Sequence, residues 1–160
     1  MKPMPKLSFT RLTDVAPEAI AAHMSDPRMA AHMPLLSGRA WTADDARAFV
    51  AMKETYWTRD GLGHWAFLAD GDYAGWGGFQ KEGEDWDFGL VLRPDRFGLG
   101  LPLSRMALDV ARQDPRIPYV TFLLPPSRRH LGALARMGAT YTGDVDHDGE
   151  TFRRFRLTTS

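Results

Sequence analysis

The segment from Trp86 to Leu124 limits the possible folds more than any other part of the chain. Residues 86–92 have the pattern of a β-strand, and residues 119–124 form a continuous apolar run that suits a strand buried on both faces. Between them, apolar residues repeat at helical spacing, namely Leu103, Met106, Ala107, Val110 and Ala111. A strand, a helix and a second strand in this order predict a right-handed crossover between two parallel strands.

Further strand and helix patterns surround this unit. The other predicted strands cover residues 7–11, 65–69, 73–79, 139–145 and 151–157. Helices are predicted from Pro17 to the stop at Pro27, from the possible N-cap Thr42, and around Leu131, Leu134 and Ala135; Lys53 interrupts the apolar stripe of the second. Strands 65–69, 73–79 and 86–92 read as an antiparallel meander, and the last two strands as a hairpin. The pattern predicts an α+β fold, with a mixed sheet and helices on both faces.

Composition removes several classes of function. The 160 residues contain 20 basic and 20 acidic side chains, so no net positive field attracts nucleic acid or an anionic membrane. The chain has no cysteine, which excludes disulfides, thiolate metal sites and a cysteine nucleophile. Residues 1–6 are not followed by the apolar run of a signal peptide or a transmembrane segment. We therefore expect one cytoplasmic domain over residues 1–160, with no nucleic-acid or membrane partner.

Two glycines stand between the strand at 86–92 and the amphipathic helix. Gly98 and Gly100 allow a ligand to approach the backbone closely, and the first turn of the helix offers N–H groups and the positive end of a dipole. The turn therefore suits a pyrophosphate. It lacks the lysine and hydroxyl pair of a Walker loop and the third glycine of a Rossmann loop. The alternative is that the glycines only turn the chain.

These segments resemble the GNAT superfamily of N-acetyltransferases, within it the branch of the ribosomal-protein alpha-amino acetyltransferases. The most specific match is Asp87-Phe-Gly89-Leu-Val-Leu92-Arg-Pro94 followed by Phe97-Gly98-Leu-Gly100, which resembles the coenzyme A strand and the R/Q-x-x-G-x-G/A turn. Phe97 replaces Arg or Gln, and Pro102 replaces a small residue and lacks an N–H. Residues 127–139 resemble the last helix of the family, with Ser127 and His130 in place of Asn and Ser.

The resemblance implies a fold and a cofactor. The fold is a single GNAT domain with about seven strands, splayed between the fourth and the fifth, and about four helices. Acetyl-CoA is expected in the splay as the acetyl donor. The residues expected to bind it are Leu90, Val91, Leu92, Phe97, Gly98, Leu99, Gly100, Leu101, Leu103 and Ser127.

The implied reaction is acetyl transfer to a primary amine by direct attack in a ternary complex. Asp87 is the candidate base, with a surface ion pair as its alternative role, and His130 is the candidate acid, with simple packing as its alternative. Candidate acceptor residues are His32, Met33, Trp41, Trp76 and Trp86, for each of which core packing is the alternative. The family also contains homodimers, so a homodimer is a possible assembly.

Two segments near the C-terminal end of the sequence carry other recognisable patterns. Asp144 to Gly149 matches only the first half of an EF-hand loop, because Phe155 stands where the glutamate ligand belongs, so we expect no metal. Arg153, Arg154 and Arg156 alternate between the two faces of the last strand and suggest a solvated edge strand. Two rival functions stay open, a non-catalytic acyl-CoA-binding sensor or partner domain and a module that binds another nucleotide.

Overall fold

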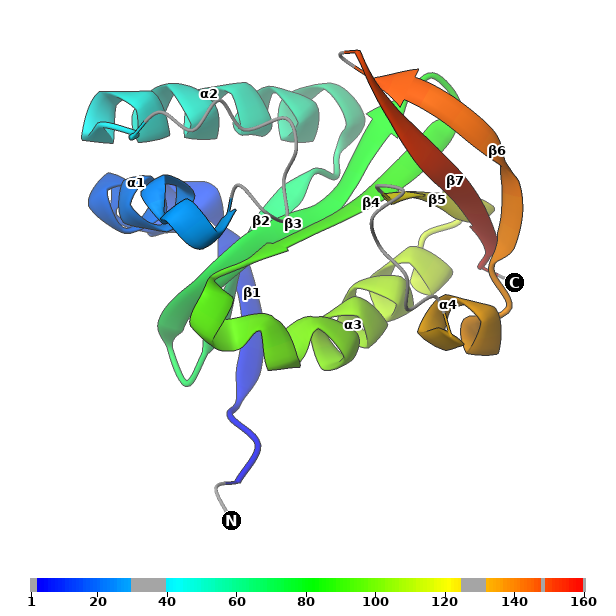
Figure 1. Cartoon of the computed structure of the whole chain (residues 1–160), viewed down its shortest axis with the longest axis horizontal. Helices are drawn as coiled ribbons and strands as arrows, with labels where there is room; N and C mark the ends of the chain where they lie inside the picture. The colour runs from blue at the N-terminus through cyan, green and yellow to red at the C-terminus, as the bar shows by residue number, and fades with distance from the viewer. Residues whose placement is uncertain (1–2, 30–39, 125–131, 148, 160) are drawn as a thin grey trace.

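A computed structural model describes residues 3–29, 40–124, 132–147 and 149–159 of the chain. Its centre is one seven-stranded sheet in the order β1-β2-β3-β4-β5-β7-β6 (Figure 1). Only β4 and β5 are parallel; all other neighbouring strands are antiparallel. The strands are β1 (Leu7–Arg11), β2 (His64–Ala69), β3 (Asp72–Glu82), β4 (Asp85–Leu92), β5 (Tyr119–Leu124), β6 (Thr140–His147) and β7 (Glu150–Thr158). The predicted α+β class, meander, crossover and hairpin are confirmed.

Helices cover both faces of this sheet (Figure 1). The α-helices of the described residues are α1 (Pro17–Ser25), α2 (Ala43–Asp60), α3 (Gly100–Gln113) and α4 (Gly132–Met137). The buried residues of α1 and α2 pack in a cluster with Trp76 of β3, whereas Leu103 and Ala107 of α3 pack against Phe79 and Phe88 in the larger core. Because neighbouring residues of a strand point to opposite faces, each strand contributes side chains to both layers. None of the described helices is long and apolar enough to cross a bilayer.

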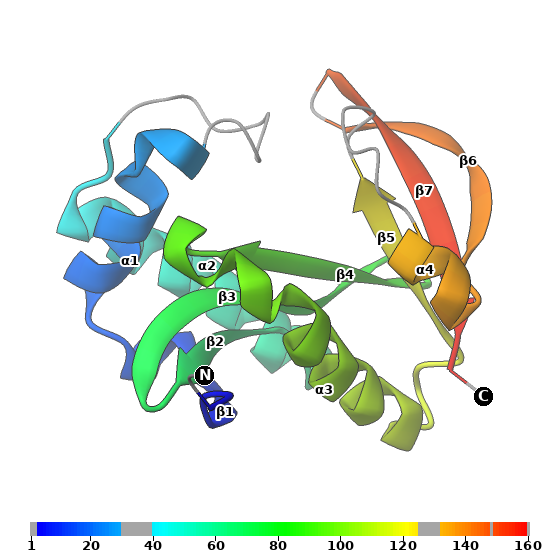
Figure 2. The ribbon, with the colours of Figure 1, turned by 60° about the horizontal axis from the view of Figure 1, so that its bottom comes forward.

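The sheet opens between its two parallel strands. The register of β4 and β5 contains two residue pairs, Asp87 with Thr121 and Phe88 with Phe122, and no later ones. On its other edge β4 stays paired with β3 as far as Leu92. Figure 2 shows β5 leaving the line of β4 together with β6 and β7. The predicted splay between the fourth and fifth strands is therefore confirmed, and within the described part of the chain one edge of β4 has no partner strand after Phe88.

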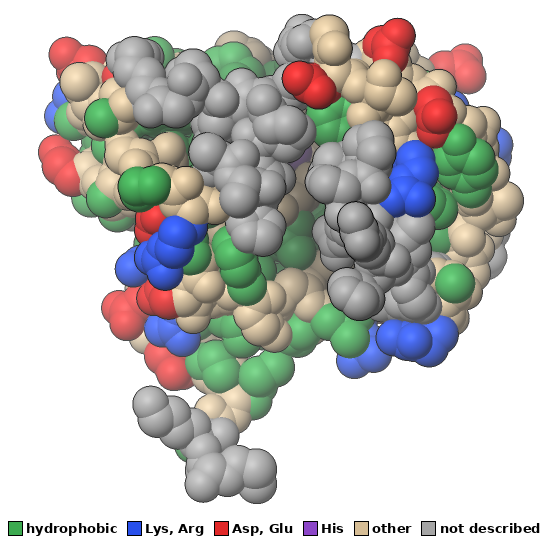
Figure 3. Space-filling view, viewed as in Figure 1, with side chains coloured by type: hydrophobic (Ala, Val, Ile, Leu, Met, Phe, Trp, Pro, Cys, Tyr) green, Lys and Arg blue, Asp and Glu red, His purple; other side chains and the backbone are tan. Residues whose placement is uncertain are grey.

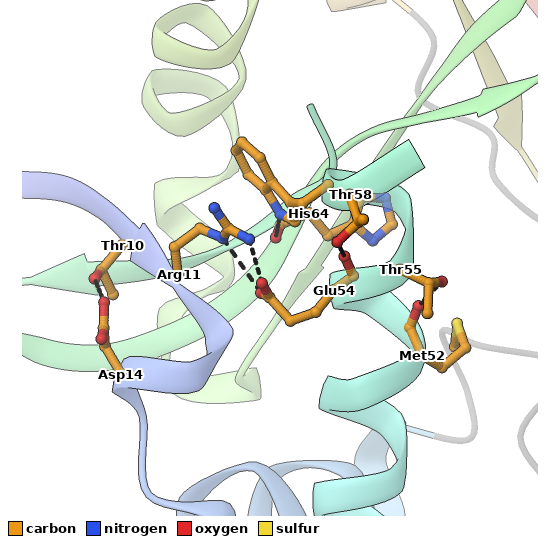
Figure 4. Close-up of polar contacts among 9 residues, drawn as sticks. Thr10, Arg11, Asp14, Met52, Glu54, Thr55, Thr58 and His64 are labelled. Carbon is orange, nitrogen blue, oxygen red and sulfur yellow. Dashed lines mark hydrogen bonds and ion pairs between the residues drawn. The ribbon is translucent and has the colours of Figure 1, made fainter. Parts of the chain in front are cut away.

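Helix α2 is fixed at both ends by local sequence signals. Thr42 and Asp45 form a capping box, in which the Thr42 hydroxyl accepts from the Asp45 N–H and the Asp45 carboxylate accepts from the Thr42 N–H. Gly61 ends the helix in a left-handed conformation with φ of 72°. Glu54 forms an ion pair with Arg11 of β1, which ties the helix to the first strand (Figure 4).

Two details differ from the sequence prediction. The arginine-rich strand β7 is an inner strand between β5 and β6, so the prediction of an edge strand is wrong. Its arginines find partners there: Arg154 pairs with Asp85, and the guanidinium of Arg156 lies 3.8 Å from the ring centre of Tyr119. The second difference concerns Lys53 of α2. The sequence suggested that Lys53 interrupts the apolar stripe of this helix, but the residue is only 8% exposed and belongs to the buried face.

Candidate functional site

The unpaired edge of β4 presents backbone groups to the splay. The Arg93 N–H donates to the Ala74 carbonyl at 2.8 Å, so the backbone groups of Arg93 point toward β3. Because these groups alternate sides along a strand, those of Leu92 and Leu90 point the other way, into the opening beside β5. Val91 by the same alternation turns its backbone toward β3 and packs its side chain beside α1 and α2. The geometry thus favours Leu90 and Leu92 over Val91 as backbone contacts for a ligand in the splay.

The glycine turn follows at the end of β4. A 3-10 helix covers Pro94–Leu99 and continues directly into α3 at Gly100, where Leu99 is the N-cap and no side chain caps the helix. Gly98 and Gly100 both lack a positive φ, and Gly100 has helical φ and ψ of −57° and −48°. The conformation of the turn therefore does not require glycine at either position.

Packing does not require these glycines either. Among the described residues, a Cβ atom added at Gly98 would meet no other atom within 4 Å, and one at Gly100 would lie 3.6 Å from the Leu90 side chain, an ordinary contact. By contrast, a Cβ at Gly77 would come within 2.3 Å of the Gly89 carbonyl oxygen, where only glycine fits. The turn thus keeps open space above a helix N-terminus, which is the shape that an incoming phosphate needs.

The surroundings of the turn are partly apolar. Phe97 and Leu101 are 40% and 41% exposed, whereas Leu99 and Leu103 point into the core. The Gly100 N–H donates to the Phe97 carbonyl within the turn. Pro102 in the first turn of α3 has no N–H to offer. Gly100 and Pro102 therefore reduce the number of backbone N–H donors that this turn can give to a phosphate.

Asp87 lies at the point where β4 and β5 separate. Its Oδ1 accepts a hydrogen bond from the hydroxyl of Thr121 at 2.9 Å, and Thr121 is 2% exposed. Trp86 and Phe88 point into the core under α3, so Asp87 between them faces the side of α1 and α2. A carboxylate fixed at the start of the splay is well placed to accept a proton from a group bound on that side.

Two buried polar residues near Asp87 were not identified from the sequence. Lys53 donates to Gln80 Oε1 at 3.0 Å, its Nζ lies 5.0 Å from the ring centre of Trp76, and Gln80 is the register partner of Asp87. Burial lowers the pKa of Lys53 to about 8. His64 is 7% exposed, and its Nδ1 has no hydrogen-bond partner in the described part of the chain. Burial, with a smaller contribution from Lys53, lowers the pKa of His64 well below its usual value, so the ring is neutral.

The sequence contained only a partial indication that Lys53 and His64 are buried. Lys53 interrupts an otherwise apolar stripe, which is a mark of a buried or paired charge. His64 directly precedes the predicted strand at 65–69 and belongs to no motif, so nothing in the pattern distinguishes it.

The predicted acceptor residues separate into three groups. Trp41 and Trp76 both pack on Phe49 of α2, with ring centres 5.3 and 4.9 Å away, on the same face as Asp87. Trp86 is 3% exposed in the core on the opposite face, between the cations of Lys81 and Arg116, so its predicted place in the acceptor site is not supported. The acceptor candidates His32 and Met33 lie outside the described part of the chain, as do Ser127, predicted to bind the cofactor, and His130, the candidate acid.

Comparison with known families gives the context for this geometry. A family model described as an acetyltransferase (GNAT) domain matches residues 6–139. The chain belongs to the GNAT acetyltransferase family. Within this GNAT domain, the splay and the glycine turn are the elements that the sequence resemblance assigns to coenzyme A.

Solved structures share the fold over nearly the whole length. A GnaT-family acetyltransferase from Bordetella pertussis, described as putative, is 18% identical with a TM-score of 0.73, and the match covers 98% of this chain and 100% of that one. RimL, a ribosomal L7/L12 alpha-N-protein acetyltransferase solved with coenzyme A, is 14% identical with a TM-score of 0.76 and coverages of 98% and 96%. The spermidine N-acetyltransferase of Vibrio cholerae, solved with CoA and spermine, is 9% identical with a TM-score of 0.72 and the same coverages.

Proposed function

We propose that this GNAT domain transfers an acetyl group from acetyl-CoA to a primary amine, by direct attack of the amine in a ternary complex. The observation that carries the proposal is the pair of glycines at 98 and 100, which neither backbone conformation nor packing requires. Their position at a helix N-terminus, beside the open edge of β4, suits a ligand with a pyrophosphate and an extended arm. An amine as acceptor is supported by relatives whose names specify a ribosomal protein, spermidine and an aminoglycoside.

The residues of the chain have distinct roles in this proposal. Acetyl-CoA supplies a thioester that a neutral amine attacks readily once the two are held together. The backbone groups of Leu90 and Leu92 bind the pantetheine arm and polarise the thioester carbonyl. The N–H groups of the turn at 98–103 hold the pyrophosphate, except those of Gly100, which bonds to Phe97, and Pro102, which has none; Leu99 and Leu103 fix the turn to the core.

Proton transfer completes the mechanism. Asp87, held by Thr121, accepts a proton from the acceptor ammonium, which frees the lone pair that forms the new C–N bond. The C–S bond breaks as the amide forms, the nitrogen gives up its second proton to solvent, and the sulfur leaves with a proton. His130 remains our candidate for the acid that supplies this proton. Replacement of His130 with Ala should change the turnover profile between neutral and alkaline pH, and an unchanged profile would remove this role.

The experiment that tests the function is an amine-acceptor screen that measures the release of free coenzyme A. We expect release above the background hydrolysis of acetyl-CoA with at least one class among peptide N-termini, amino acids, polyamines and aminoglycosides. Binding of acetyl-CoA with no acceptor-dependent release would instead favour a sensor or partner domain. Pro102 gives that alternative some support, because it removes one N–H from the first turn of α3. A cytoplasmic location and a homodimer stay predictions.

A further inference from the structure

Gly89 of β4 leaves unfilled space on the face of the sheet that carries Asp87. Its φ is not positive, so the backbone conformation does not require glycine. Among the described residues, a Cβ atom built on Gly89 would meet only the ring of His64 within 4 Å, at 3.8 Å, an ordinary contact. Neither conformation nor packing therefore requires glycine here, and the space above Gly89 can take at least a methyl group.

This space lies where the two reactants have to meet. Gly89 is partly exposed, and in the described chain β4 has no partner strand on this edge after Phe88. Asp87 precedes Gly89 by two residues on the same face, and the backbone of Leu90, which faces the splay, follows directly. An amine that gives a proton to Asp87 and attacks a thioester held at Leu90 therefore lies over Gly89.

The far side of the splay carries acidic side chains. Asp144, Asp146 and Glu150 belong to the end of the β6–β7 hairpin, and Figure 3 shows acidic side chains over this end of the molecule. In Figure 2 the hairpin stands across the splay from α1. Because the acceptor arrives as an ammonium, these carboxylates favour its approach to the splay.

His64 closes the space above Gly89 on the side of β2. Its Cε1 and Nε2 both lie 3.8 Å from the Cβ position of Gly89, and its ring centre lies 5.5 Å from that of Trp76. Of the two ring nitrogens, only Nδ1 is fully buried without a hydrogen-bond partner in the described chain. A proton on Nδ1 would be a buried donor without an acceptor, so the neutral ring carries its proton on Nε2, on the side of Gly89.

Lys53 adds a positive charge next to this ring. Burial and then the Lys53 ammonium lower the pKa of His64, and the ammonium itself is held by Gln80 Oε1 at 3.0 Å. On this side of the space a second ammonium would be repelled, whereas an oxygen atom would be attracted. The space above Gly89 thus has a carboxylate, Asp87, on one side and a hydrogen-bond donor, His64 Nε2, on the other.

We propose that Gly89 and His64 select the acceptor: Gly89 admits a branched carbon next to the amine, and His64 Nε2 donates a hydrogen bond to an oxygen two carbons away from the nitrogen. The proposal rests on the proposed function, because it takes the amine to lie between Asp87 and the thioester. The acceptor class is a primary amine on a branched carbon with a carbonyl or hydroxyl oxygen on the next carbon. A polyamine has neither the branch nor the oxygen.

The first test compares three acceptors that differ by one feature each. Propylamine has neither oxygen nor branch, glycinamide has the oxygen, and alaninamide has both. We expect kcat/KM in the wild type to rise in this order. Gly89→Ala should lower kcat/KM at least tenfold for alaninamide and less than threefold for glycinamide, with the affinity for acetyl-CoA and the melting temperature nearly unchanged. Equal losses for the two amides, or a wild type that prefers propylamine, would overturn the proposal.

The second test separates the donor of His64 from its shape. His64→Phe keeps a ring without the donor, and His64→Gln keeps a donor near the place of Nε2. The bond from Trp57 Nε1 to the His64 carbonyl involves only the backbone of His64 and stays in both. We expect His64→Phe to raise KM for the two amides about tenfold with kcat nearly unchanged, and His64→Gln to restore most of it. An equal rise of KM for propylamine would mean that His64 only supports the fold.

The third test needs no turnover. The His64 ring is followed by NMR in the folded protein with coenzyme A bound, while alaninamide is added. We expect a saturable shift in the wild type and binding at least tenfold weaker in Gly89→Ala; a shift that does not saturate, or that Gly89→Ala retains, overturns the proposal. Absence of acetyl-CoA binding in the wild type would instead remove the proposed function, and the same titration without coenzyme A would still decide whether the space above Gly89 binds this amine.

Discussion

Lys53 shows how strongly one residue can depart from its sequence pattern. Lys53 of α2 is 8% exposed, and its ammonium is held by Gln80 and lies 5.6 and 5.0 Å from the ring centres of Phe49 and Trp76. An ammonium is costly to bury, which is why its pKa falls from 10.5 to about 8. The unfolded chain therefore holds this proton up to pH 10.5, whereas the folded chain loses it near pH 8.

This difference predicts how stability depends on pH. Between about pH 8 and 10.5 the unfolded state binds more protons, so Lys53 makes the free energy of unfolding rise with pH in that window. We expect Lys53→Met to remove about 3 kcal/mol of this rise, since each pKa unit corresponds to about 1.4 kcal/mol. Urea unfolding at pH 7 and pH 10 measures it. Lys81→Met, at a less buried lysine, should keep the wild-type slope; an unchanged slope in Lys53→Met would contradict the buried ammonium.

Asp87 is the residue on which the chemistry depends most. We expect Asp87→Asn to lower kcat/KM by 10²- to 10⁴-fold, the usual effect of losing a general base, while the affinity for acetyl-CoA changes less than threefold. Asp85→Asn is the matched control, two residues earlier on the same face and bonded to Tyr119 and Arg154. Steady-state kinetics with calorimetry separates the two effects. Equal losses in both variants would mean that Asp87 has only a structural role.

The elements of the fold follow largely from local signals. Prolines and glycines end the helices and strands near the predicted positions, and the apolar spacing of α3 identifies the residues that it buries. The inner position of β7 could not be predicted, because its arginines look solvated until Asp85 and Tyr119 are brought beside them by the fold. Trp86 lies in the core with Phe88, on the face opposite Asp87, and strand alternation from Asp87 already indicated that the two could not share a site.

The cap of α2 offers a quantitative test at this scale. We expect Thr42→Ala to lower the free energy of unfolding by about 1 kcal/mol, because it removes one side of the capping box. Thr55→Ala, in the interior of the same helix, should change it by less than about 0.5 kcal/mol. Chemical denaturation of both variants checks this. A smaller loss for Thr42 than for Thr55 would show that the box does not stabilise the helix.

The molecule as a whole is organised around the separation of two parallel strands. The resemblance to the GNAT family predicted this splay, whereas the physical pattern of residues 86–124 predicted only that the two strands are parallel. Where the pairing stops depends on how the pair β5 and β7 packs against the rest of the sheet, which no local pattern encodes. Only the complete fold brings the open edge of β4, the glycine turn and Asp87 together.

In our proposal Gly98 and Gly100 serve a ligand and not the fold. Calorimetry of acetyl-CoA binding, run beside thermal unfolding, tests it on the wild type and on the double variant Gly98→Ala with Gly100→Ala. We predict that the variant is at least as stable as the wild type, since alanine suits both positions, and that its affinity for acetyl-CoA is at least tenfold weaker. A variant that binds acetyl-CoA as well as the wild type, or a wild type that does not bind it, would contradict this role of the two glycines.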